Sequence, residues 1–162
     1  MLYSLIAHIN ILTKDFGKKI NMALKIQKKH LELIKAYGVE SYPNECCGFL
    51  LGKPNNGDKE VLSTFPSVNA REEREKYHRF LITSDAYLQC EKFAKVKNMD
   101  IIGFYHSHPN AETNPSAYDV EYGWPWYSYV IVSIANNKAL EVTSWILQND
   151  RSKFKQEKII LI

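Results

Sequence analysis

Cysteine is scarce in this chain and is not arranged for disulfide bonding. There are three cysteines, Cys46, Cys47 and Cys90, and two of them are adjacent. Small secreted domains that depend on disulfides usually carry an even number of spaced cysteines, which this sequence lacks. The cysteine content therefore favours a reducing compartment, and we predict a cytoplasmic location.

Long apolar runs, a strong charge of one sign and internal repeats are also missing. No apolar segment approaches the roughly 20 residues that a membrane-spanning helix needs, so we expect no membrane partner. Residues 1–12 are apolar, but they have neither the basic start nor the small-residue cleavage site of a secretory signal. The 21 basic and 18 acidic residues give a formal net charge of only +3, which argues against a nucleic-acid partner.

The length and the hydrophobic content of the chain suit one globular domain. The chain has 162 residues, of which 45% are hydrophobic, and this is enough for a single hydrophobic core. We predict one domain over residues 22–162. Residues 1–21 are an N-terminal extension whose status is open, because Met22 is an alternative start. The oligomeric state does not follow from these observations.

The spacing of apolar residues predicts two main helices. The first spans residues 27–37 and ends at Gly38. The second begins at Thr83-Ser84-Asp85, whose side chains suit a helix N-terminus. Its expected core face consists of Ala86, Cys90, Phe93 and Ala94.

Short apolar or β-branched runs that are bounded by turn residues predict the strands. We expect strands at 47–51, 60–68, 79–82, 101–105, 126–134 and 139–147, and a last edge strand at 154–162. We expect turns at 52–57 and 136–138, and an exposed loop at 71–76. The predicted fold class is α/β, with a mixed β-sheet flanked by at least two helices.

The most informative side chains are His106 and His108, followed by Ser116 and Asp119. Side chains at positions i and i+2 of a strand share a face, so the two imidazoles point the same way where the predicted strand 101–105 ends. A catalytic zinc ion has three protein ligands and leaves a fourth position for water, and Asp119 is the best candidate for the third ligand. Two neutral histidines and one carboxylate leave a net charge that lowers the pKa of bound water toward about 7.

A second interpretation of the same residues needs no metal. Ser116-x-x-Asp119 is also the pattern of a helix start, in which Ser116 caps the helix and Asp119 lies in its first turn. A lone His-x-His on a strand is commonly structural. Ser116 is not expected to be a nucleophile, because the nearby imidazoles are committed to the metal in the first interpretation.

The other reactive side chains receive structural interpretations. Cys46 and Cys47 fit buried small hydrophobes on opposite faces of a strand better than nucleophiles or metal ligands. Three further histidines have no motif around them and are expected at the surface or in satisfied core positions: His8, His30 and His78. The segment Trp124-Pro125-Trp126 is expected to pack after the motif helix, with Pro125 stopping that helix. A role for one of these tryptophans in a substrate groove stays open.

The spacing His106-x-His108-Pro109, with seven residues between His108 and Ser116 and two between Ser116 and Asp119, resembles the signature of the JAMM (MPN+/JAB domain) zinc metallopeptidases. That family also uses a glutamate near an early strand, and the stretch 43–52 with Glu45 resembles this part of the pattern. The similarity covers roughly residues 22–150 and is closest to small, stand-alone, prokaryote-like members. Because no ligand position is substituted, the chain resembles a catalytic member.

The resemblance implies a JAB/MPN, cytidine-deaminase-like architecture. A zinc deaminase itself would need His-x-Glu and Pro-Cys-x-x-Cys motifs, which the sequence lacks. The resemblance also implies one Zn²⁺ per chain with three protein ligands: His106, His108 and Asp119. It gives Glu45 the role of general base and Ser116 that of a hydroxyl donor to the developing oxyanion. The residues alone do not favour Glu45 over Glu112 or Glu121.

The implied activity is that of a zinc peptidase or isopeptidase. The resemblance points to an amide bond after the C-terminal Gly-Gly of a ubiquitin-like protein or a β-grasp sulfur carrier. Such a tail would fit as an added strand beside a sheet edge. The alternative is a non-catalytic, protein-binding scaffold, as in the metal-free members of the family. The ligand set separates the two functions, while the identity of the substrate and the native metal stay open.

Overall fold

The computed structural model describes residues 22–162. The predicted N-terminal extension, with His8, lies outside this range. The elements in chain order are β1 (Ala23–Ile26), α2 (Lys28–Ser41), β2 (Cys47–Asn55), β3 (Asp58–Ser67), the short 3₁₀ helix η1 (Glu73–Glu75), α3 (Ser84–Val96), β4 (Asp100–Pro109), α4 (Ala117–Tyr122), β5 (Ser128–Ala135), β6 (Lys138–Leu147) and β7 (Phe154–Leu161).

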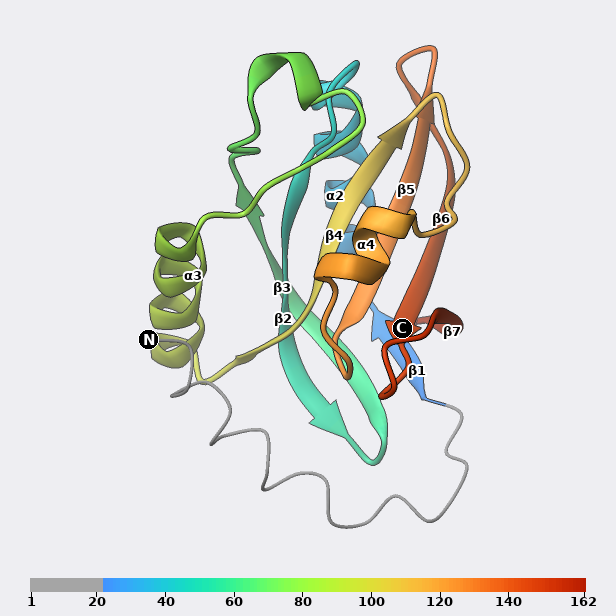
Figure 1. The fold of residues 1–162 in the computed structure, drawn as a ribbon. Coiled ribbons are helices and arrows are strands. Elements are labelled where there is room, and N and C mark those ends of the chain that lie inside the picture. Colours follow the sequence, from blue (N-terminus) through green and yellow to red (C-terminus); the bar gives the residue numbers. More distant parts are fainter. Residues whose placement is uncertain (1–21) are drawn as a thin grey trace.

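The strands form one mixed sheet that closes into a barrel, in the order β1-β3-β2-β4-β5-β6-β7 (Figure 1). Strand β1 pairs in parallel with both β3 and β7, and β4 pairs in parallel with β5. The mixed sheet with flanking helices is as predicted, but the closure is not. The predicted edge position of 154–162 is wrong, because β7 lies between β6 and β1.

Strand β1 closes the barrel and was not predicted. Its residues Leu24 and Ile26 are fully buried, but they directly precede the predicted helix 27–37 and give no strand signal of their own. Four residues that alternate inward are too few to separate a strand from a helix start by periodicity alone. Closure therefore depends on tertiary pairing that the local sequence does not reveal.

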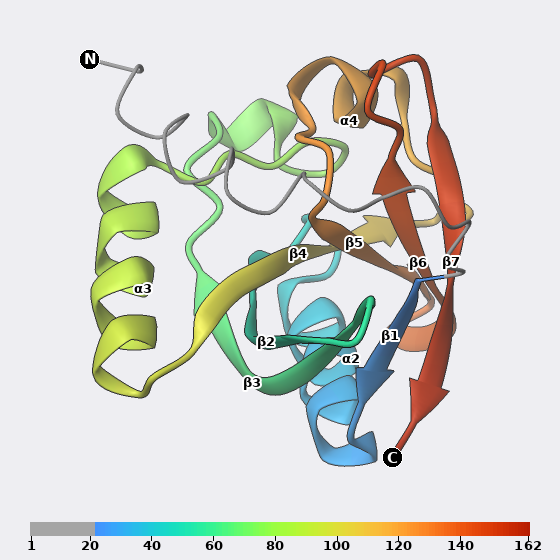
Figure 2. The ribbon, with the colours of Figure 1, turned by 90° about the horizontal axis from the view of Figure 1, so that it is seen from below.

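The two longer helices cover opposite faces of the sheet (Figure 2). In β2, Leu50 belongs to the core cluster that α2 joins through Leu31 and Ile34. Its neighbours Phe49 and Leu51 belong to a second cluster, together with residues of α3. Because successive strand residues point to opposite faces, the continuous apolar run at 47–51 marks a strand buried on both sides.

Helix α2 continues three residues beyond its predicted end at Gly38. A Cβ atom at Gly38 would lie 2.9 Å from the Cδ1 atom of Ile134 on β5. The missing side chain therefore serves close helix–strand packing rather than helix termination. In α3, Thr83 caps the helix by accepting a hydrogen bond from Ala86 N–H over 3.1 Å, as predicted.

The predicted core face of α3 holds only in part. Cys90 and Ala94 are buried, whereas Phe93 is 38% exposed and packs its ring against Phe65. The predicted strand at 79–82 is wrong, because these residues lie in an irregular segment between η1 and α3. The loop at 71–76 contains η1, none of whose residues is buried.

The other predicted strands are present with shifted ends. β2 runs to Asn55, so the turn begins later than predicted, at Asn56-Gly57, where both residues have positive φ. The hairpin turn after β5 also uses two residues with positive φ, Asn136 and Asn137, which is the conformation that asparagine and glycine tolerate best.

Strand β4 is longer than the predicted 101–105 and runs through Pro109. Its parallel pairing with β5 continues to the end, where Asn110 N–H donates to the Ile134 carbonyl over 2.7 Å. His106 and His108 therefore lie within the strand and not beyond its end. Tertiary pairing holds these polar residues in extended conformation, and this fixes the direction of both imidazoles.

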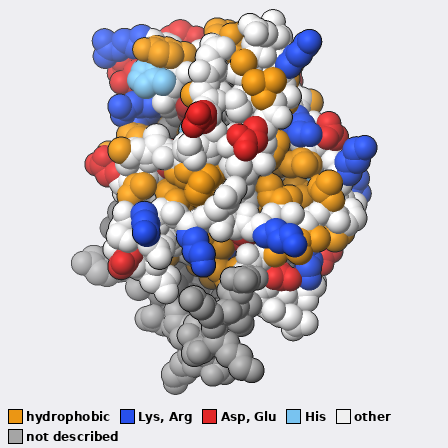
Figure 3. All heavy atoms as spheres, turned by 90° about the vertical axis from the view of Figure 1, so that its right-hand side faces the viewer, with side chains coloured by type: hydrophobic (Ala, Val, Ile, Leu, Met, Phe, Trp, Pro, Cys, Tyr) orange, Lys and Arg blue, Asp and Glu red, His pale blue; other side chains and the backbone are white. Residues whose placement is uncertain are grey.

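The side of the molecule drawn in Figure 3 carries hydrophobic side chains in separate groups that are broken up by charged ones of both signs. This mixture agrees with the small net charge of +3. In residues 22–162, none of the helices is both long and apolar enough to cross a membrane.

Candidate metal centre

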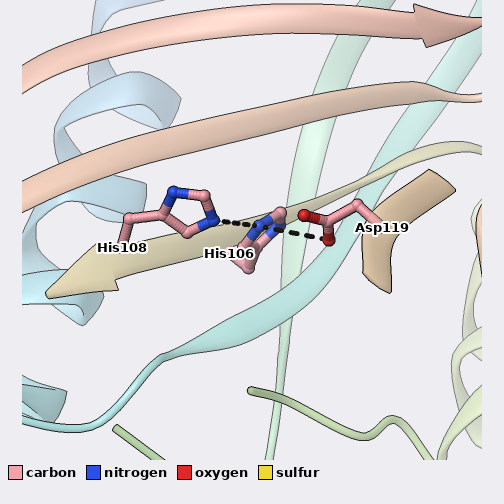
Figure 4. Close-up of side chains that lie close together, drawn as sticks. All are labelled: His106, His108 and Asp119. Atoms are coloured by element: carbon pink, nitrogen blue, oxygen red, sulfur yellow. Dashed lines mark hydrogen bonds and ion pairs between the residues drawn. The ribbon is translucent and has the colours of Figure 1, made fainter. Parts of the chain in front are cut away.

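His106 and His108 on β4 turn their Nε2 atoms toward one another, 3.0 Å apart (Figure 4). The alternation of the strand puts both side chains on one face, as the sequence predicted. His106 is 1% exposed and His108 is 9% exposed. The ring of Phe80 stacks on the ring of His106 with a centroid distance of 4.7 Å, which shields it from water.

Asp119, the third residue of α4, uses its two carboxylate oxygens for different contacts. Its Oδ1 lies 3.6 Å from His106 Nε2. Its Oδ2 accepts hydrogen bonds from the Ser116 N–H over 2.7 Å and from the Ser116 hydroxyl over 2.6 Å. Ser116 in turn caps the helix by accepting from Asp119 N–H over 3.2 Å. Asp119 therefore takes part in the helix cap through Oδ2 and approaches the histidines through Oδ1, so both interpretations of this residue apply.

The contact of His108 with the loop between β4 and α4 determines which of its ring nitrogens is an acceptor facing His106. Its Nδ1 lies 2.7 Å from the Glu112 carbonyl oxygen. A carbonyl cannot donate, so Nδ1 carries the proton and Nε2 keeps its lone pair. His106 Nδ1 is buried without a hydrogen-bond partner in the described part of the chain. Backbone carbonyls commonly orient metal-binding histidines in the way that Glu112 orients His108.

Burial and neighbouring charges hold His106 and Asp119 in deprotonated form near neutral pH. Burial lowers the pKa of His106 to about 4, against the attraction of Asp119. Burial alone would raise the pKa of Asp119, but His106 and the hydrogen bonds from Ser116 hold it below its ordinary value. Metal ligands must be deprotonated to bind, so His106 and Asp119 have the protonation states that a cation needs.

The three side chains fit a divalent ion such as zinc. One ligand atom from each of His106, His108 and Asp119 lies within 4.8 Å of the others. Two ligands at 2.0–2.1 Å from a tetrahedral zinc ion lie about 3.3 Å apart, and the observed separations of 3.0 and 3.6 Å bracket this value. Two imidazole Nε2 atoms 3.0 Å apart need a proton or a cation between them, and the converging carboxylate oxygen of Asp119 supplies the third ligand atom that a cation needs.

A cavity of about 180 Å³ lies over this cluster. Its lining brings together the residues that the sequence singled out, which are Glu45, His106, His108, Ser116 and Asp119. The segment 77–80 forms another part of the wall, together with Tyr118 of α4. Neither Glu112 nor Glu121 lines the cavity, so the geometry favours Glu45 among the three glutamates that the sequence left open.

Glu45 is 6% exposed and lies just before β2. Burial raises its pKa to about 8, the negative charge of Asp119 adds to this, and Arg79 opposes it. In residues 22–162 its carboxylate makes no hydrogen bond, whereas its main chain is held on both sides. Its N–H donates to the Lys76 carbonyl over 2.7 Å, and its carbonyl accepts from the Asn69 side chain over 3.1 Å.

Sequence reasoning missed the loop that closes this cavity. Asn69, Arg79 and Phe80 belong to no motif, and 71–76 was predicted only as an exposed loop. A single asparagine between a strand and a charged run gives no signal of the four hydrogen bonds that it makes. Only the spatial approach of the loop to Glu45 and His106 shows their part in the site.

The structural interpretation of the cysteines agrees with the structure. Cys46, Cys47 and Cys90 are buried and free. Burial raises the pKa of Cys46 to about 11 and that of Cys47 to about 12, so both stay protonated thiols at neutral pH. Since the thiolate is the nucleophile and the metal ligand, neither role suits them.

The remaining aromatic and imidazole side chains lie outside the cluster. His30 is buried in α2, whereas His78 is exposed and lines the cavity. Trp124 and Trp126 do not line the cavity. Helix α4 ends at Tyr122, and Pro125 follows three residues later, a position where a proline prevents a helix from continuing.

Comparison with known proteins agrees with this fold. Residues 27–148 match a family model described as prokaryotic homologs of the JAB domain. The chain is 32% identical over 125 residues to a desampylase of Pyrococcus furiosus, covering 76% of this chain and 80% of that protein. It is 37% identical over 93 residues to a desampylase of Haloferax volcanii, covering 56% and 63%.

Two solved structures have the same fold. The solution structure of a protein from Desulfitobacterium hafniense superposes with a TM-score of 0.75 at 28% identity, covering 86% of this chain and 92% of that one. A solution structure from Salinibacter ruber gives a TM-score of 0.68 at 36% identity, covering 85% and 91%. The fold is thus that of a JAB-type domain. The chain belongs to the family of prokaryotic homologs of the JAB domain.

Proposed function

We propose that this protein is a zinc-dependent isopeptidase or peptidase that hydrolyses an amide bond after the C-terminal Gly-Gly of a ubiquitin-like or β-grasp sulfur-carrier protein. The observation that carries the proposal is the convergence of two imidazole nitrogens and one carboxylate oxygen beneath a cavity that also holds Glu45. The similarity to two proteins named desampylase supports a ubiquitin-like modifier as the substrate.

In this proposal His106, His108 and Asp119 hold one zinc ion per chain. When bound, zinc supplies Lewis-acid polarisation of a water molecule and of the scissile carbonyl. Glu45 would take a proton from the attacking water as the water oxygen adds to the carbonyl carbon, and would deliver that proton to the leaving amine as the C–N bond breaks. Its burial in the wall of the same cavity suits this role, because a general base must lie within reach of the proton that it takes.

Ser116 has two duties to reconcile. Its hydroxyl proton is directed at Asp119 Oδ2, so in this structure it orients a metal ligand. Ser116 also lines the cavity, and we retain its hydroxyl as a donor to the developing oxyanion, for which its single proton must turn away from Asp119. Both duties require that the hydroxyl stay where α4 begins.

The sheet offers a place for an extended tail. The pairing of β2 with β4 ends at Cys47 and His106, whereas β4 continues to Pro109 beside β5. In the described sheet, His108 and Pro109 therefore have one edge that β2 does not cover, next to the cluster. A Gly-Gly tail has no side chains to exclude it from a narrow groove and would lie along this edge as an added strand.

The test combines metal analysis with a cleavage assay. We expect about one zinc per chain in protein purified without chelators, and loss of that zinc in His106→Ala and Asp119→Ala. His78→Ala is the matched control, because His78 lines the same cavity outside the cluster. Offered a ubiquitin-like protein with a short extension after Gly-Gly, the wild type should release the extension, as seen by mass spectrometry. A folded protein that holds no zinc and leaves every such substrate intact would instead be the non-catalytic scaffold.

A further inference from the structure

A row of aromatic rings and guanidinium groups runs outward from the cavity along α4. Tyr118 and Tyr122 lie one helical turn apart, with ring centroids separated by 4.4 Å. Trp124 follows two residues later, just past the helix end. We call this surface the arginine–aromatic ridge, and it consists of Tyr118, Tyr122, Trp124, Arg71, Arg79 and Arg151.

The three arginines of the ridge are stacked on its rings. The guanidinium groups of Arg71 and Arg79 lie 5.0 and 4.7 Å from the centroid of the Tyr118 ring. The guanidinium of Arg151 lies 5.3 Å from the centroid of the Trp124 ring and donates a hydrogen bond to the Glu121 carbonyl over 2.9 Å. Such stacking fixes long side chains, so little further side-chain entropy is lost when a partner binds.

The ridge is not explained by packing within the domain. Tyr122 is 59% exposed and Trp124 is 50% exposed, and Asp119 is the one buried residue of α4. These large rings could be replaced by small polar residues without opening the core. Aromatic residues and arginine are the types enriched at protein–protein interfaces and among the residues that dominate binding energy.

The charge of the ridge is only partly balanced. Arg71 pairs with Glu75 at 3.6 Å. Within residues 22–162, Arg79 and Arg151 make no ion pair with a carboxylate. Arg79 is near Glu45, but that carboxylate is buried in the cavity and belongs to the site. Within residues 22–162 the ridge therefore presents the guanidinium of Arg151 without an acidic partner and that of Arg79 with only the buried Glu45 near it, which is complementary to an acidic surface.

The ridge is continuous with the cavity, because Tyr118 and Arg79 belong to both. A protein whose tail enters the cavity must keep its folded body outside the mouth, and the ridge is a surface that begins there. We propose that the arginine–aromatic ridge docks the folded body of the protein substrate through an acidic face of that body. This inference rests on the proposed function and adds to it the surface that recognises the substrate apart from its tail.

The experiment compares two substrates with the same scissile bond. One is a folded, net-acidic ubiquitin-like protein with a short extension after Gly-Gly. The other is a synthetic peptide that contains only its last eight residues and the same extension. The variants are Tyr122→Ala/Trp124→Ala and Arg151→Gln, none of which alters the cavity lining. The control is Leu88→Ala on α3, whose side chain is 49% exposed.

In the double variant, KM for the folded protein should rise on the order of tenfold, with kcat unchanged and with kcat/KM for the peptide within twofold of wild type. Arg151→Gln should raise KM for the folded protein and weaken its dependence on salt. Leu88→Ala should change neither substrate. An equal loss on peptide and protein would mean that the ridge acts through the site, and an unchanged KM would mean that it docks nothing; either result overturns the inference.

The inference is separable from the proposed function. If the wild type cleaves neither substrate, the proposed function fails, and docking is then measured by calorimetric titration of the folded protein into wild type and into the double variant. Weaker binding by the variant alone would keep the docking surface. Equal affinities would overturn it. It would also be overturned if the wild type bound a single-stranded oligonucleotide and not the folded protein, and if the same substitutions abolished that binding.

Discussion

The side-chain amide of Asn69 donates a hydrogen bond to the main-chain carbonyl oxygen of Glu45 over 3.1 Å. The same amide donates to the Arg79 carbonyl over 2.9 Å, and its oxygen accepts from the N–H groups of Arg71 and Leu81 over 3.1 and 3.2 Å. One asparagine thus ties three points of the loop to the segment that carries the candidate general base. The position of Glu45 above the cluster depends on this contact.

We expect Asn69→Ala to lower kcat about 10- to 100-fold while zinc content stays near that of wild type. The substitution leaves four backbone groups without their partner, each of which costs roughly 1–3 kcal/mol where water cannot replace it. The loop then moves relative to Glu45, but the metal ligands lie on β4 and α4 and keep their geometry. Steady-state kinetics and metal analysis on the same preparation measure both quantities.

The control for Asn69 is Asn55→Ala, at the far end of β2 from Glu45. It should leave kcat unchanged. Loss of zinc together with activity in Asn69→Ala would show that this residue supports the fold as a whole and does not position Glu45.

Glu45→Gln separates metal binding from proton transfer. Glutamine has nearly the same shape but cannot take up a proton, so cleavage should fall by roughly 10²–10⁴-fold. Zinc content should be unchanged, because Glu45 lies outside the group of converging ligand atoms. Glu112→Gln and Glu121→Gln are the matched controls, since neither side chain lines the cavity. Turnover by Glu45→Gln at the wild-type rate would remove this residue from the mechanism.

Ser116→Ala tests which duty of the hydroxyl dominates. We expect zinc affinity to fall by about tenfold, because groups that orient a metal ligand typically contribute 10- to 100-fold to affinity. The free energy of unfolding should also fall by about 1 kcal/mol through loss of the helix cap. Competition with a chromogenic chelator and urea unfolding measure the two effects, and Ser116→Thr should restore both. Unchanged zinc affinity with a lower kcat would instead leave oxyanion donation as the only duty of Ser116.

The sequence was sufficient for the parts of the site that follow from local geometry. His106 and His108 share a face because strands alternate, and Asp119 lies near them because Ser116 starts a helix there. The two interpretations of Asp119, as part of the helix cap and as a converging ligand, are compatible because its carboxylate has two oxygens. The position of Glu45 could be predicted only from the family resemblance, because nothing local distinguishes it from other loop glutamates.

The parts that could not be predicted depend on contacts between distant segments. β1 is four residues long and becomes a strand only by pairing with β3 and β7. β4 extends through its histidines because β5 pairs with it there. The segment at 79–82 has β-branched and aromatic character, yet Asn69 holds it as an irregular loop over the cavity. Local propensity is overridden at each of these places by partners that are remote in sequence.

The last prediction concerns a buried ion pair far from the proposed chemistry. Lys59 Nζ lies 4.0 Å from Glu157 Oε1 and donates a hydrogen bond to the Ser128 hydroxyl over 3.0 Å, with both charged side chains almost fully buried. Burial lowers the pKa of Lys59 from 10.5 to about 8, against the attraction of Glu157. Between these two values the unfolded chain holds a proton that the folded protein has released. The Lys59 contribution to the free energy of unfolding therefore rises with pH across this window, by roughly 3 kcal/mol at most.

Replacing both partners, in Lys59→Met/Glu157→Gln, removes this titration. The double variant should be at least as stable as wild type at pH 7, because neutral groups of similar volume avoid the cost of burying two charges. Its advantage should shrink as pH rises from 8 toward 10.5, where wild-type Lys59 becomes neutral. Urea unfolding at pH 7, 9 and 10 measures the difference at each pH, which cancels the opposing contribution of the buried cysteines. The control is Lys158→Met, at an exposed position on β7 next to Glu157. Its free energy of unfolding should change with pH in parallel with that of wild type. Parallel curves for the double variant as well would mean that Lys59 keeps an ordinary pKa in the folded protein, and that its burial is relieved by water or by a shift of β7.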